Sequence, residues 1–180
     1  SILDFSNGDC PMSTLSVDTI QGKTTAGTVA MPSGSVVQMQ TAQLSGGATS
    51  YTGTSYADTG LTVNITPKFA TSKIFVLVTQ QIGITVSGAN DQARMDTRLI
   101  ETGSSTVISA TFFEGTDTQV TGNLSVTHSQ HGHFQCSSTN TLTFKSQARP
   151  ATGSASTASA LNLAWYTNSV HNITAIEITQ

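Results

Sequence analysis

The sequence predicts an all-β protein built as an antiparallel β-sandwich. Three observations support this fold class. The β-branched residues Thr, Val and Ile are abundant and suit a pleated, half-buried surface. Charged residues make up only 9% of the 180 positions, so the good helix formers Glu, Lys and Arg are scarce. Short apolar stretches recur between segments rich in Gly, Ser and Thr, at the spacing that is typical of sandwich strands.

The chain divides at about residue 32. Residues 1–32 contain few large apolar side chains, so we expect an extended N-terminal arm, a stem or a docking segment. Residues 33–180 are long enough for one head domain with a core of its own. The text from Met12 onward also reads like a natural start site, which would make residues 1–11 an upstream extension.

The predicted strands of the head differ in how they are buried. Residues 61–65 alternate apolar and polar side chains and then meet Pro67, which predicts a half-buried strand with a stop. Residues 73–79, KIFVLVT, are apolar on both faces and should form the most buried strand. In residues 94–100 two arginines and an aspartate share one face, which is polar and exposed or lies in an interface. The full set of predicted strands is 35–40, 61–65, 73–79, 82–86, 94–100, 106–113, 123–128, 141–147, 161–166 and 173–179.

The charge pattern excludes some partners and favours others. The net charge is −3 and the seven basic residues are spread along the chain, so we expect no nucleic-acid partner. No apolar run reaches the roughly 18 residues of a membrane helix, so we expect no membrane insertion. A chain so poor in charge is suited to burying much of its surface against copies of itself or other proteins. Cys10 and Cys136 are expected to be free, inert thiols, with a disulfide as the alternative.

Three stretches resemble a known family. The run SYADTGLTVNITPKFATSKIFVLVT (55–79), followed by RLIETGSSTVI (98–108) and ITAIEI (173–178), resembles the C-terminal head domain of tail-fibre and related structural proteins of marine bacteriophages. STLSVDTIQGKT and MPSGSVVQ are similar to the leader and hinge ahead of that head. The resemblance implies a virion structural protein without enzymatic activity, forming a homotrimer through a jelly roll similar to the C1q and tumour-necrosis-factor heads.

The stretch HSQHGHFQC, residues 128–136, departs from that family pattern and raises the question of a metal. His131 and His133 are two apart and face the same way on a strand, so three copies around a trimer axis would offer six imidazoles to one axial metal ion. No other cofactor is expected. One alternative is an exposed polar loop or strand end broken by Gly132. Another is a zinc site within a single chain, made by His128, His131, His133 and Cys136.

Catalysis has little support in the sequence, and recognition of sugars has somewhat more. No GxSxG elbow, HExxH or phosphate-binding loop occurs, so we expect no enzyme. Tyr51 and Tyr56 lie in a polar stretch and are the candidate contacts to a host-surface glycan, because aromatic rings stack on sugar rings. Trp165 is expected in the core.

We therefore expect a trimeric fibre head or tip, exposed on the phage particle for recognition of the host surface. Its expected partners are copies of itself, other virion proteins through residues 1–32, and host-surface glycan. The alternatives are a capsid decoration or head-fibre protein bound to the shell through its N-terminal arm, and a free carbohydrate-binding module.

Overall fold

The computed structural model describes residues 32–45, 55–86, 92–116, 122–150, 161–162 and 170–180. Of the predicted arm, only Pro32 falls within these ranges, and Trp165 falls outside them. Over the ranges described, the chain forms β-strands and no helix. These ranges accordingly hold no helix that could span a membrane.

The strands follow the predicted order, and several are longer than predicted. The shortest of the described strands, β8, has only two residues. In the described ranges the strands are β1 (Val36–Ser45), β2 (Ala57–Ile65), β3 (Lys73–Val86), β4 (Gln92–Glu101), β5 (Thr106–Thr116), β6 (Gly122–Gln135), β7 (Leu142–Pro150), β8 (Leu161–Asn162) and β9 (Val170–Ile178).

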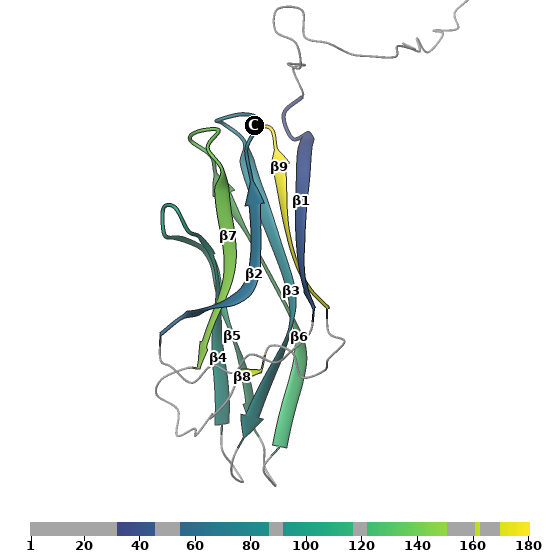
Figure 1. Ribbon diagram of the computed structural model, residues 1–180, viewed down its shortest axis with the longest axis vertical. Helices are drawn as coiled ribbons and strands as arrows, with labels where there is room; N and C mark the ends of the chain where they lie inside the picture. The colour runs from purple at the N-terminus through teal and green to yellow at the C-terminus, as the bar shows by residue number, and fades with distance from the viewer. Residues whose placement is uncertain (1–31, 46–54, 87–91, 117–121, 151–160, 163–169) are drawn as a thin grey trace, which may run out of the picture. The chain divides into compact units, whose positions relative to one another are not determined.

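The strands form two sheets that pack against each other (Figure 1). Sheet A has the order β1-β9-β3-β6, with β8 added beside β3, and sheet B has the order β2-β7-β4-β5. All pairs are antiparallel. Two four-stranded antiparallel sheets whose strands interleave in this order form a jelly roll. The predicted β-sandwich is confirmed, and the chain ends beside the start of β1, where Gly34 N–H donates to the Thr179 carbonyl at 2.9 Å.

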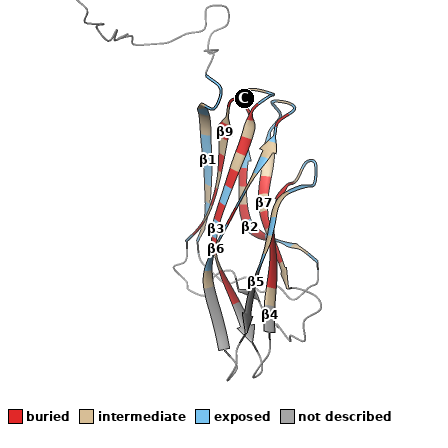
Figure 2. Cartoon of the chain, turned by 180° about the vertical axis from the view of Figure 1, so that it is seen from behind, coloured by how far each residue is buried: buried red, intermediate tan, exposed pale blue. Residues whose placement is uncertain are grey.

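The apolar core lies between the inner faces of the two sheets. Side chains alternate between the two faces of each strand, so every second residue points inward, as the banded colouring in Figure 2 shows. Phe144 of β7 is fully buried and meets Phe134 of β6 edge-on, with the ring centres 5.9 Å apart. The buried cluster contains Leu61, Val63, Ile65, Ile74, Val76, Val78, Leu99, Cys136, Phe144, Ile173 and Ala175.

Strand β3 departs from its prediction in two ways. The two predicted strands, 73–79 and 82–86, are a single strand. Ile74, Val76 and Val78 are buried as expected, but the intervening side chains face outward, and Leu77 keeps 38% of its surface exposed. The expectation that residues 73–79 form the most buried strand is therefore wrong for a single chain, because a two-sheet sandwich covers only one face of each sheet and residues 94–100 are more buried.

A buried carboxylate connects the end of β9 to the segment between β2 and β3. Glu177 is fully buried and accepts hydrogen bonds from the backbone N–H groups of Lys68 (2.8 Å) and Phe69 (3.1 Å) and from Gln38 Nε2 (2.6 Å). Burial raises the pKa of Glu177, but these hydrogen bonds outweigh it and hold the pKa below its usual value. The alternation of Ile173, Ala175 and Glu177 along β9 places this carboxylate inward.

Candidate functional site

His131 and His133 lie on β6, at the edge of sheet A. Both are exposed on its outer face, where they pair across the sheet with Leu77 and Phe75 of β3. The His131 ring lies 5.9 Å from the Phe75 ring, centre to centre. The two imidazoles therefore share a face, as their spacing requires, and a metal shared between chains stays a prediction.

Gly132 does not break this strand. The structure shows β6 continuous from Gly122 to Gln135, so the expectation of a loop or a strand end at Gly132 is wrong. A Cβ atom at Gly132 would lie 2.6 Å from the Ile108 carbonyl oxygen of β5. The glycine thus lets β5 and β6 come together where the two sheets meet at their edges.

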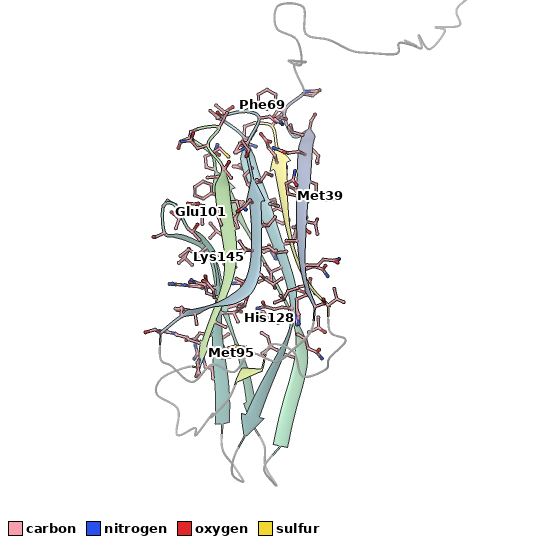
Figure 3. All side chains as sticks on the ribbon, viewed as in Figure 1. Met39, Phe69, Met95, Glu101, His128 and Lys145 are labelled. Carbon is pink, nitrogen blue, oxygen red and sulfur yellow. The ribbon has the colours of Figure 1, made fainter. Side chains whose placement is uncertain are left out.

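The alternative zinc site within one chain is also wrong. Alternation along β6 places His128 on the inner face, and Cys136, which follows the strand, is buried, while His131 and His133 point outward. His128, labelled in Figure 3, has its Nε2 atom 3.1 Å from Oγ1 of Thr97, which is fully buried inside the sandwich. Among the residues described, no three His, Cys, Asp or Glu side chains are grouped for a metal ion.

Burial shifts the pKa values of one thiol and two imidazoles in the direction that favours their uncharged forms. Burial lowers the pKa of both His128 and His171, and His171 Nδ1 accepts a hydrogen bond from Gln81 N–H at 3.0 Å. Burial, with the nearby Glu177 carboxylate, raises the pKa of Cys136 to about 11, and its thiol is free. A thiol with so high a pKa is a poor nucleophile at neutral pH.

The outer face of sheet A carries a patch of apolar side chains that we call the apolar face. Its residues occupy neighbouring positions in the register of β1, β9 and β3, and directly opposed residues share a face. Met39 is 62% exposed and projects from β1 in Figure 3, and Val36 is 59% exposed. The apolar face consists of Val36, Met39, Phe75, Leu77, Ile176 and Ile178.

The surroundings of the apolar face are almost free of charge. Its four cross-strand rows are Val36–Ile178–Lys73–Gln135, Met39–Ile176–Phe75–His133, Thr41–Thr174–Leu77–His131 and Gln43–Asn172–Thr79–Ser129. Lys73 is the one permanently charged residue in these rows, and the two histidines border the patch on β6. A second protein surface can therefore approach without having to desolvate many charges.

The opposite outer face, on sheet B, carries a group that we call the arginine cluster. Tyr56 precedes β2 and is half-buried, with the guanidinium carbons of Arg98 and Arg149 lying 4.1 and 4.4 Å from its ring centre. On the neighbouring strands, the Arg94 guanidinium lies 4.1 Å from the centre of the Phe112 ring. Tyr51, the other predicted glycan contact, lies outside the described residues. The arginine cluster consists of Tyr56, Arg94, Asp96, Arg98, Phe112 and Arg149.

Asp96 fixes two of these guanidinium groups. Arg94 NH2 lies 3.0 Å from Asp96 Oδ1, and Arg149 NH2 lies 3.2 Å from Oδ2 of the same carboxylate. The sequence predicted that Arg94, Asp96 and Arg98 share a face, and the structure confirms it. The sequence did not predict that Tyr56 and Arg149 lie beside these residues, because their position depends on β7 lying between β2 and β4.

Comparison with known proteins gives no match for this chain. The sequence matches no model of a known protein family and none of the curated proteins.

Proposed function

We propose that this chain is a non-enzymatic virion structural protein whose β-sandwich head associates into a homotrimer through the apolar face. The observation that carries the proposal is a patch of six apolar side chains, three exposed and three half-buried, on a face that has almost no charge. The resemblance of residues 55–79, 98–108 and 173–178 to the head domain of bacteriophage tail fibres supports a virion role. In that role the head stands at the tip of a fibre, exposed to the host surface.

The size of the apolar face suits contact with another copy of the chain. The four cross-strand rows that contain the apolar face cover four strands about 4.8 Å apart and seven residues of about 3.4 Å each, and span on the order of 450 Å² in flat projection. Protruding side chains make the accessible area larger than this projection. Soluble monomers rarely expose contiguous apolar patches of more than a few hundred Å², and a standard interface takes roughly 800 Å² from each partner.

A copy of the same chain is the best-matched occupant of this face. A partner with many charges would have to desolvate them against Met39, Phe75 and Leu77. Three copies of the apolar face that meet around a three-fold axis have no such cost, and polar Thr, Gln and Ser side chains border each face on both sides. Because β6 is an edge strand, His131 and His133 come close to the boundary between neighbouring copies in such an assembly.

Two substitutions on the apolar face test this proposal against a matched control. Leu77→Glu and Met39→Glu each place a carboxylate in the interface, and we expect either to turn the oligomer into a monomer in sedimentation-velocity runs. Val107→Glu makes the same change at an apolar side chain that is 45% exposed on β5, and it should leave the oligomer intact. An oligomer that survives both Leu77→Glu and Met39→Glu would contradict the proposed interface.

The location of this protein on the virus particle requires a separate experiment. Antibodies against the head, applied to virions that carry this protein, should label fibre tips. Labelling spread over the capsid shell would instead support a decoration protein held through residues 1–32.

A further inference from the structure

The arginine cluster concentrates positive charge in a chain that is acidic as a whole. All three arginines of the sequence lie on the outer face of sheet B, although the net charge of the chain is −3. Lys145, labelled in Figure 3, lies on the same sheet and pairs with Asp58 at 2.6 Å. Over the residues whose side chains the structure describes, this face has four basic side chains and, in Asp58 and Asp96, two carboxylates. Its small positive excess suits a ligand with one or two negative charges.

The guanidinium groups are held in place while part of each remains available. The Asp96 carboxylate forms ion pairs with Arg94 and Arg149. Because the Asp96 side chain is only 13% exposed, its main role is to position these two guanidinium groups. Arg98 donates from Nε to Gln147 Oε1 at 2.7 Å. In the described part of the chain, the two terminal nitrogens of Arg98 have no hydrogen-bond acceptor. Guanidinium groups that are fixed beforehand lose less entropy when they bind a carboxylate.

A shallow open hollow of about 230 Å³ lies within the cluster. Its lining combines two aromatic rings, one guanidinium group and one carboxylate, since it is formed by Tyr56, Arg94, Asp96, Ala110, Thr111 and Phe112. Phe112 is 54% exposed, so much of its side chain is accessible. Aromatic rings stack on the apolar faces of sugars, arginine pairs with a carboxylate, and aspartate accepts hydrogen bonds from hydroxyl groups.

We propose that this hollow binds a saccharide that carries a carboxylate, such as a uronic or sialic acid residue. The sugar ring packs against Phe112, beside Tyr56, and its carboxylate accepts hydrogen bonds from Arg94. A nucleic acid suits the site less well, because binding to a phosphate backbone depends on many uncompensated cations. As host-surface recognition, this site deepens the proposed function, but the binding itself requires only one chain.

Calorimetric titration of the full chain tests the proposal with defined probes. The probes are 3′-sialyllactose and a galacturonic acid trisaccharide, each with its uncharged counterpart, lactose or a galactose trisaccharide, and sodium sulfate as a simple anion. We expect at least one acidic saccharide to bind at least tenfold more tightly than its uncharged counterpart. Arg94→Gln and Phe112→Ala should each weaken that binding at least tenfold, whereas Lys145→Gln, the same charge change outside the hollow, should alter it less than twofold.

Several outcomes would overturn this assignment. They are the absence of binding by both acidic saccharides, binding that Arg94→Gln and Phe112→Ala leave unchanged, and sulfate binding as tight as that of the saccharide, which would indicate a simple anion site. Circular dichroism of each variant checks that it is folded. The molecular mass measured in the same samples separates this inference from the proposed assembly. A monomer that binds the saccharide contradicts only the trimer. A trimer that does not bind the saccharide contradicts only the binding site.

Discussion

Replacing Glu177 by Gln removes a buried charge while keeping the shape of the side chain. In the native protein this carboxylate accepts hydrogen bonds from Lys68 N–H, Phe69 N–H and Gln38 Nε2. A glutamine keeps one acceptor oxygen, but its NH2 group then faces a donor. The substitution therefore weakens the remaining hydrogen bonds and leaves at least one buried donor without an acceptor.

The expected loss of stability follows from these contacts. Hydrogen bonds to a charged group contribute roughly 1.5–3 kcal/mol each, neutral ones about 1 kcal/mol, and an unsatisfied buried donor costs about 1–3 kcal/mol. We expect Glu177→Gln to lower the free energy of unfolding by about 2–4 kcal/mol at pH 7. That is a large part of the 5–15 kcal/mol typical of a folded domain.

The effect should depend on pH in a definite direction. The pKa of Glu177 lies below its ordinary value of 4.5 in the folded state, so the charged form stabilises the fold above the unfolded pKa. This contribution begins to diminish as the pH falls below about 4.5 and is lost as the pH passes through the lower folded pKa. The difference in stability between the native protein and Glu177→Gln should therefore shrink in that acidic range.

Urea unfolding followed by far-ultraviolet circular dichroism, at pH 7 and at intervals down to pH 3, measures this difference. All samples need the same protein concentration, because association makes stability depend on concentration. Ile65→Val, a fully buried change without a titratable group, serves as the control and should cost about 0.5–1.5 kcal/mol at every pH. A loss below 1 kcal/mol for Glu177→Gln at pH 7, or one that stays constant down to pH 3, would refute this explanation of the buried carboxylate.

Three further predictions concern the inside of the sandwich. Phe144→Ala should lower the free energy of unfolding by about 3–5 kcal/mol in urea titrations, because this ring is fully buried, and a loss below 2 kcal/mol would argue against its central place in the core. Gly132→Ala should cost roughly 1–3 kcal/mol, because its Cβ would lie 2.6 Å from the Ile108 carbonyl oxygen, and an unchanged melting temperature would contradict the close approach of β5 and β6. Burial lowers the pKa of His171, so its neutral form adds stability above pH 6.5 that is lost as the pH falls toward the folded pKa. Its C2 proton should accordingly titrate below pH 6.5 in NMR spectra, and a midpoint at or above 6.5 would contradict this.

Alternation along single strands made much of the fold predictable. The spacing of Leu61, Val63 and Ile65 indicated a half-buried strand, and all three are buried. The same alternation indicated that His131 and His133 share a face. The apolar run KIFVLVT in β3 was wrongly expected to be the most buried strand. A sequence pattern cannot distinguish an apolar face that is buried within one chain from an apolar face that stays exposed on it.

The arginine cluster shows what local pattern could not supply. Arg94, Asp96 and Arg98 lie within five residues of one another and were predicted to share a face. Arg149 reaches Asp96 only because β7 pairs with β4, and such pairing between distant strands leaves no signal in either strand alone. Gly132 was misjudged for a related reason, since its role depends on Ile108 of β5 rather than on its own neighbours in the sequence.

The mass of the purified chain in solution, measured by light scattering over a range of concentrations, tests the proposed assembly most directly. Self-association through the apolar face predicts three times the 18.7 kDa of one chain. Repeating the measurement with a strong chelator, together with metal analysis, tests the predicted axial ion, which requires bound metal and a trimer weakened by its removal. A mass of 18.7 kDa at all concentrations would contradict the homotrimer and leave the apolar face without the partner proposed for it.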